Sequence, residues 1–271
     1  MAARAPRWTQ RLRCLLRRLT LGAALLIGSA AWGQQSTGYV LLPAGRIDSV
    51  LGGAAAAANG GPQPVASFWM RVVPVSRAEF QRFIAAHPEW RRDRVPRTFA
   101  DAGYLADLPD AVPEEQARQP VTRVSWFAAQ AYCESEGARL PTWTEWEYAA
   151  AADATRTDAR ADPVWRARIL GGYARPATAP LPDVGGPANV YGVRDLHGLV
   201  WEWVDDFNAL LVSGDSRDQD DPDKLQFCGA GAIELKDRDN YAVLMRIALL
   251  SSLQASGSTG NLGFRCVRPQ P

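Results

Sequence analysis

The stretch from Asp195 to Trp203 constrains this chain more than any other. Its nine residues, Asp-Leu-His-Gly-Leu-Val-Trp-Glu-Trp, combine two tryptophans, two carboxylates, a histidine and a turn-forming glycine. Aromatic runs of this kind are usually buried, so one interpretation is a tryptophan pair in the core with solvated acids beside it. The other is a loop that binds Ca²⁺, which selects hard oxygen ligands. The candidate ligands are the side chains of Asp195 and Glu202 and the backbone carbonyls of Gly198 and Val200.

The N-terminal segment, residues 1–33, indicates export. It holds six arginines and no acidic residue, and its apolar part, 19–31, ends in small residues just before Gln34. This is the layout of a cleaved secretory signal. The apolar part is short for a membrane span, although an uncleaved anchor remains the alternative. We therefore expect residues 34–271 to form one periplasmic or secreted domain, free of the membrane once the signal is removed; Arg17-Arg18 also permits a twin-arginine route.

The charge balance and the scarcity of histidine exclude several function classes. The chain has 30 basic and 29 acidic residues, and removal of the arginine-rich signal leaves an acidic excess. A nucleic-acid partner is not expected, because it requires a clustered basic face. The two histidines, His87 and His197, are too few for a zinc or iron site built on several imidazoles.

Three cysteines follow the signal segment, namely Cys133, Cys228 and Cys266. In an oxidising compartment an odd number permits one disulfide and leaves one thiol. Cys228 stands in a glycine-rich segment, where it is either a redox or metal-binding thiol or a small buried residue, which is the usual role of a free cysteine.

Short elements separated by long loops are expected along the chain. Two capping boxes, Ser76–Glu79 and Thr142–Glu145, predict helix starts. Residues 89–113 form a long charged loop, and loops of this length are often functional. Residues 153–187 show no clear period, and 52–64 reads as a flexible loop. Further helices are expected after Ser125 and over 241–253, and strands over 39–42, 67–73, 121–124 and 263–267.

Three motifs in order carry a resemblance to a known family. They are Pro120–Trp126 continuing through Ala131-Tyr132-Cys133 and Arg139–Thr142 to Glu145–Ala150, then Tyr191-Gly192 with Trp201–Trp203, and finally Asn261–Cys266. Together they resemble the formylglycine-generating enzyme family, also called the sulfatase-modifying-factor domain, over about residues 39–268. The resemblance implies a single mixed α+β domain, related to the C-type lectin fold, with much irregular chain.

The resemblance also implies site residues. The Asp195 and Glu202 side chains and the Gly198 and Val200 carbonyls match the family's Ca²⁺ ligand positions, so Ca²⁺ is the expected cofactor. Cys133 and Cys266 match positions that are bridged in secreted members, which leaves Cys228 as a free thiol. The alternative pairing, Cys228 with Cys266, would leave Cys133 free.

The chain departs from the family at its catalytic centre. Active members oxidise a cysteine of a client sulfatase to formylglycine, using two nearby cysteines with copper and O₂. An ungapped count back from Asn261 reaches Ala242 and Ile247, and neither is a cysteine. Because a soft thiolate pair is what holds Cu(I), neither bound copper nor the standard activity is expected. Cys228 is the remaining catalytic candidate.

A finer resemblance concerns residues 87–92, 99–104 and 227–229, which are similar to the NirV branch of the family, associated with bacterial copper nitrite reductase. This implies an accessory or maturation role for a periplasmic protein client, such as a copper enzyme. Two alternatives remain open: an oxidase with altered metal or redox chemistry at Cys228, and a small-ligand binding module on a lectin-like scaffold.

Overall fold

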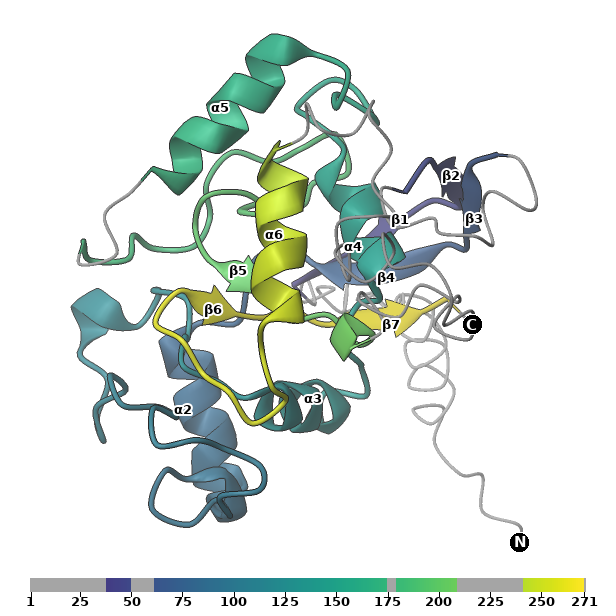
Figure 1. Ribbon diagram of the computed structural model, residues 1–271. Coiled ribbons are helices and arrows are strands. Elements are labelled where there is room, and N and C mark those ends of the chain that lie inside the picture. Colours follow the sequence, from purple (N-terminus) through teal and green to yellow (C-terminus); the bar gives the residue numbers. More distant parts are fainter. Residues whose placement is uncertain (1–37, 50–60, 175–178, 209–240, 271) are drawn as a thin grey trace, which may run out of the picture. The chain divides into compact units, whose positions relative to one another are not determined.

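The structure, a computed structural model, describes residues 38–49, 61–174, 179–208 and 241–270 (Figure 1). The chain divides into two compact units, Met1–Thr37 and Gly38–Pro271, and all described residues belong to the second. The predicted signal segment and Cys228 therefore lie outside the described residues. Within the described part, no helix is long and apolar enough to cross a membrane.

A three-stranded antiparallel sheet joins the two ends of this unit. Its order is β1 (Tyr39–Leu42), β4 (Phe68–Arg71) and β7 (Val267–Pro269), and Met70 of β4 lies opposite Val267 of β7. Met70 is fully buried, as the alternation of apolar residues along 68–71 requires for a strand with one face in the core. The sheet therefore closes the domain by pairing both its first strand, β1, and its last strand, β7, with the central strand β4.

Two small ladders complete the β structure. Strands β2 (Gly45–Ile47) and β3 (Gln63–Val65) pair antiparallel, so the predicted loop 52–64 ends in a strand that sequence reasoning missed. Strands β5 (Trp201–Glu202) and β6 (Leu262–Gly263) pair in parallel. This second ladder brings the tryptophan-rich stretch next to the C-terminal motif.

The helices begin where the capping residues predict. Ser76 and Glu79 form a capping box, as do Thr142 and Glu145, and Ser125 accepts a hydrogen bond from the third residue after it. The helices are α2 (Arg77–Ala86), α3 (Trp126–Ser135), α4 (Trp143–Ala150), α5 (Pro163–Tyr173) and α6 (Tyr241–Ser251), with short 3₁₀ turns at η1 (Pro88–Trp90) and η2 (Glu114–Gln116). In Figure 1, α2 and α3 lie on one side of the strands and α4, α5 and α6 on the other.

Local structure differs from the prediction in three places. The strand expected over 263–267 is interrupted, because strand structure is found only in β6, up to Gly263, and in β7, from Val267. The expected strand over 121–124 does not form, because Arg123 adopts a left-handed backbone with φ 56°, which no strand residue can have. Helix α5 arises in the stretch without a clear period. Asp162 caps it by accepting from the Val164 and Trp165 N–H groups, and Pro163 occupies its first turn.

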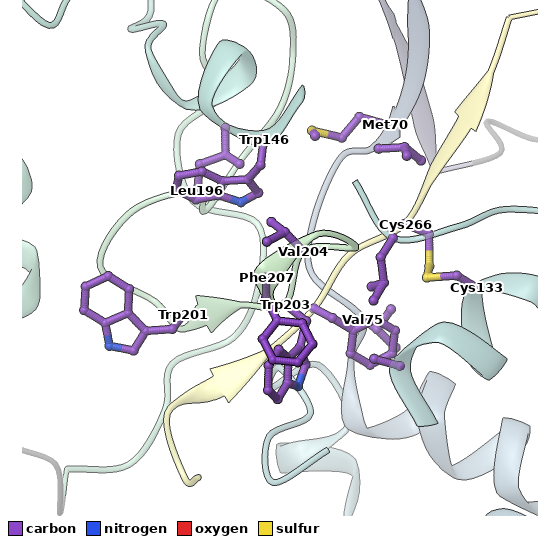
Figure 2. Packing of buried hydrophobic residues seen from close by; sticks show 14 of the residues in the cluster. Met70, Val75, Cys133, Trp146, Leu196, Trp201, Trp203, Val204, Phe207 and Cys266 are labelled. Carbon is purple, nitrogen blue, oxygen red and sulfur yellow. A yellow bond between two sulfur atoms is a disulfide. The ribbon is translucent and has the colours of Figure 1, made fainter. Parts of the chain in front are cut away.

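The core is aromatic and is crossed by a disulfide. Trp203 packs against Phe207, with ring centroids 5.0 Å apart, and both are buried. Cys133 of α3 and Cys266, just before β7, are joined nearby (Figure 2). The result is the mixed α+β domain that the sequence predicted, in which long irregular segments pack on one main aromatic core and two smaller apolar clusters.

Candidate functional site

The stretch from Asp195 to Trp203 enters the core through two left-handed residues. Asp195 has φ 59° and Gly198 has φ 79°. A Cβ on Gly198 would stand 3.1 Å from the Cα of Gly172 in α5, so only glycine permits this close approach. The loop can therefore pack directly on α5 before it continues into β5.

Glu202 is half of a fully buried ion pair. The Arg265 Nε and Nη2 groups donate to its two carboxylate oxygens at 2.8 and 2.7 Å, and both side chains have no solvent exposure. Trp146 adds a third donor, Nε1, at 2.8 Å. A buried charge is tolerated when it is paired and its remaining hydrogen-bonding positions are satisfied, as they are here.

Arg246 of α6 lies beside this pair. Its guanidinium carbon stands 3.5 Å from the centroid of the Trp146 ring, and Nη2 donates to the Glu202 backbone carbonyl at 2.7 Å. Its Nε has no hydrogen-bond acceptor among the described residues. Burial lowers the pKa of Arg246 to about 10, while the Glu202 charge acts against that fall. The aromatic face and the nearby carboxylate are what hold this cation in the core.

His197 is a partly buried, neutral imidazole. Its Nε2 lies 2.8 Å from the Ala150 carbonyl oxygen, which can only accept, so Nε2 carries the proton. Its Nδ1 then accepts from the Tyr173 hydroxyl at 3.4 Å. Burial lowers the pKa of His197 from 6.5 to about 4. The sequence assigned His197 to the loop, and the structure adds that it anchors this loop to α4 and α5.

Two cavities flank the stretch. The smaller, about 20 Å³, lies between α4, α5 and α6 and is lined by Ala242, Arg246 and aromatic side chains. The larger, about 410 Å³, is named here the Trp201 cleft, since Trp201 stacks on Tyr173 in its wall with centroids 4.4 Å apart. Its polar lining comes from Arg77, Asp107, Gln116, Gln119, Arg123 and Asn261.

The structure gives the predicted Ca²⁺ carboxylates other partners. Both Asp195 oxygens accept backbone N–H groups, from Gly185 at 2.6 Å and Gly186 at 3.0 Å, and Glu202 is held by Arg265. In the described part of the chain, no group of three or more His, Cys, Asp or Glu side chains is placed to hold a metal ion. As they stand, these oxygens do not fit a calcium ligand set, and calcium binding stays a prediction.

The structure also locates the two predicted backbone ligands of calcium and two of the three cysteines that follow the signal segment. Gly198 and Val200 line the Trp201 cleft. Cys133 and Cys266 form the disulfide that the family resemblance implied, with their Cα atoms 5.5 Å apart. Cys228, the remaining catalytic candidate, lies outside the described residues.

Sequence reasoning missed the arginines of the cleft. Arg77 follows a helix cap, and Arg123 interrupts the apolar run Val121-Thr122-Arg123-Val124. A charged residue inside such a run is a signal that a specific partner or site requires it. The irregular segment 89–113, expected to be functional for its length, supplies Asp107 to the cleft.

The mixed α+β fold agrees with a domain of the sulfatase-modifying-factor class, which the family match shows. Residues 28–270 match the family described as "Sulfatase-modifying factor enzyme 1-like domain". Since this match covers nearly the whole chain, the chain belongs to that family.

Three curated relatives illustrate what the family contains. The chain is 34% identical over 216 residues to the formylglycine-generating enzyme of Streptomyces coelicolor, covering 72% of this chain and 65% of the relative. It is 35% identical over 160 residues to the hercynine oxygenase of Mycolicibacterium smegmatis, covering 52% and 37%. It is 31% identical over 164 residues to "Inactive C-alpha-formylglycine-generating enzyme 2" of Mus musculus, covering 56% and 50%. The matched chain spans less than two thirds of each relative, and their names differ in activity.

Proposed function

We propose that this protein is an exported accessory or maturation factor that binds a periplasmic protein client and does not oxidise it. The proposal rests mainly on two positions. An ungapped count from Asn261 places the family's two catalytic cysteines at these positions, and this chain has other residues there. Ala242 and Ile247 stand there, and both are buried apolar residues of α6. Because neither offers a thiolate, these positions cannot hold Cu(I).

The surroundings of α6 support the same proposal. Ala242 packs in a small apolar cluster with Ala159, Trp165 and Ile169, and Ile247 belongs to the main core. This part of α6 is therefore built as packing surface. A binding function needs only the Trp201 cleft, which is open and polar beside the aromatic wall.

The nature of the client rests on the sequence. The signal-like segment 1–33 supports an encounter outside the cytoplasm, and the finer resemblance supports a link to a periplasmic copper nitrite reductase as client. The relative named inactive is consistent with a family member that has lost formylglycine formation.

A small-ligand binding module is the second candidate, and one observation favours it. The Trp201 cleft measures about 410 Å³, within the range of roughly 300–1,000 Å³ that small-molecule sites occupy. In this case, the occupant of the cleft would be a metabolite and no protein client would be required.

Mass spectrometry tests the missing oxidation. A sulfatase-type cysteine peptide is incubated with the purified protein, copper and O₂, and the Streptomyces coelicolor formylglycine-generating enzyme serves as the positive control. We expect aldehyde formation in the control only. Robust conversion by this protein would overturn the proposal.

Client maturation is tested in a second arm. A copper nitrite reductase is produced in the periplasm with and without this protein, and its copper content and activity per molecule are measured. We expect both to rise when the protein is present. Equal values in the two strains would remove this client and leave the small-ligand candidate.

A further inference from the structure

We propose that the Trp201 cleft is a binding site for a carboxylate group, which Arg123 holds with Arg77 beside it. Where the acid belongs to a protein client, this inference rests on the proposed function and names the chemistry that the client must present. It concerns residues of the cleft that neither the calcium prediction nor the cysteine pair involves.

The backbone of Arg123 is fixed in an uncommon conformation. Its φ of 56° lies in the left-handed region, which a long side chain adopts only when the surrounding structure enforces it. Here the Arg123 N–H donates to the Thr259 carbonyl at 3.0 Å, and the Arg123 carbonyl accepts from the Leu105 N–H at 2.9 Å. The side chain therefore starts from a fixed point at the edge of the cleft.

The guanidinium of Arg123 is held between two glycines. A Cβ added to Gly260 would lie 3.4 Å from Nη2, 3.7 Å from Cζ and 3.8 Å from Nε, so the group lies flat along this residue. A Cβ on Gly103 would lie 3.6 Å from Nη1. These are ordinary van der Waals separations, so the planar group packs against the two glycine residues. This packing and the fixed backbone of Arg123 limit the side-chain freedom that would be lost on binding.

The positive charge of the cleft is only partly balanced. Arg123 Nε is buried without a hydrogen-bond acceptor among the described residues. The carboxylate that faces it, Asp107, has Oδ2 3.6 Å from this Nε and 3.7 Å from Arg77 Nη2. Arg77 is otherwise fixed by donating from Nη1 to Gln116 Oε1 at 2.9 Å. Two guanidinium groups thus share one carboxylate, and one positive charge is left over.

A monoanionic carboxylate matches this arrangement. Among the described residues that line the cleft, Arg77, Arg123 and Asp107 are the charged ones, so a single negative charge completes the balance and a dianionic phosphate exceeds it. The planar fork of arginine fits a carboxylate with two parallel hydrogen bonds. The Arg123 side chain is 35% exposed, so a ligand entering from solvent reaches it. The Trp201 ring offers an apolar surface for the chain that carries the acid.

Isothermal titration calorimetry on the full protein tests this inference with three probes. They are the end-blocked peptide Gly-Ala-Glu-Ala-Gly, its Gln counterpart, and free butyrate. A hydrogen-bonded charge pair that the Gln peptide lacks predicts roughly tenfold tighter binding of the Glu peptide. Arg123→Gln should abolish this preference, and Arg123→Lys should restore only part of it because a lysine cannot form the two-pronged contact.

Two further variants guard against loss of folding. Asp107→Asn removes the carboxylate that competes for both arginines, so it should tighten binding of the Glu peptide. Arg97→Gln removes an exposed arginine outside the cleft and should leave binding unchanged. The melting temperature of each variant is recorded beside its affinity, so that an unfolded Arg123→Gln protein is recognised and the Asp107→Asn result then decides.

The outcomes separate this inference from the proposed function. If butyrate binds and the Glu peptide does not, the carboxylate site is supported and its ligand is a small acid. Equal binding of the Glu and Gln peptides, or a preference unchanged by Arg123→Gln and Asp107→Asn, overturns the inference. Equal binding of the Glu and Gln peptides together with client maturation that persists in Arg123→Gln would overturn this site alone and leave the proposed function in place.

Discussion

At the scale of single residues, burial changes what titratable groups do. His197 stands in a stretch rich in carboxylates and reads as a polar loop residue, yet it is enclosed by Trp146 and Trp165, whose rings meet it edge-on at 5.9 and 5.4 Å. Arg246 and Arg265 add positive charge nearby, and with burial they disfavour the imidazolium form. The neutral ring then serves as a structural hydrogen-bonding link between Ala150 and Tyr173.

This burial predicts a pH-dependent loss of stability. The pKa of His197 falls from 6.5 to about 4 in the folded protein. Between these two pKa values the unfolded chain binds more protons than the folded protein, so the free energy of unfolding decreases as the pH drops. The stabilisation that the neutral His197 gives to the folded protein is fully present only above pH 6.5. The full effect is roughly 3 kcal/mol. Urea unfolding across this range should show a shallower pH dependence in His197→Gln, whose amide can still donate to Ala150. Equal slopes would mean that His197 titrates normally.

At the scale of elements, the ion pair joins pieces that are too short to be stable alone. Strands β5 and β6 have two residues each, and Glu202 lies in β5 while Arg265 follows β6. The Arg265 guanidinium also donates to the carbonyls of Arg71, the last residue of β4, and of Arg194, before the loop. One buried side chain therefore connects the three-stranded sheet and the β5–β6 ladder with the tryptophan-rich stretch.

Removal of the Glu202 charge should be costly. Glu202→Gln leaves Arg265 buried without its counter-ion, and breaking such a pair costs roughly 3–5 kcal/mol. Thermal melting should show a large fall, whereas Glu89→Gln, which affects an exposed pair with His87, should change little. We expect the same fall with calcium and with chelator. If calcium instead raises the melting temperature of the unaltered protein and not of Glu202→Gln, the calcium site predicted from the sequence is correct and the ion pair is secondary.

At the scale of the whole molecule, one covalent bond joins the middle of the domain to its end. Cys133 lies on α3 and Cys266 precedes β7, with a sequence separation of 133 residues. Bridging so long a loop restricts the unfolded chain strongly, which contributes roughly 4–5 kcal/mol in the chain-entropy description. The disulfide reinforces the closure that β7 makes by pairing with β4.

Peptide mapping checks this closure. Digestion without reductant should yield a Cys133–Cys266 linked peptide and an alkylated Cys228, and the variant Cys133→Ala/Cys266→Ala should melt at a clearly lower temperature. A Cys228-linked peptide in the native protein would contradict the pairing.

Local structure was predictable where its causes are local. The caps of α2, α3 and α4 depend on side chains three residues from their partners, and all three helices start where the sequence places them. Helix α5 escaped prediction, since Gly171 and Gly172 and scattered arginines hide its period, although Asp162-Pro163 is a recognisable start. The strand expected over 121–124 failed because Thr259 and Leu105, distant in sequence, hold Arg123 left-handed.

By itself, the sequence determined the capped helices, the family motifs, the number of cysteines and the lack of a thiol pair at Ala242 and Ile247, since these are properties of residue identity and of short spacing. The tertiary structure alone decided that Glu202 pairs with Arg265, that His197 is neutral, and that Arg77, Asp107 and Arg123 meet in one cleft. Charge state and partnership depend on burial and on groups brought together from distant parts of the chain, and no pattern of neighbouring residues contains that information.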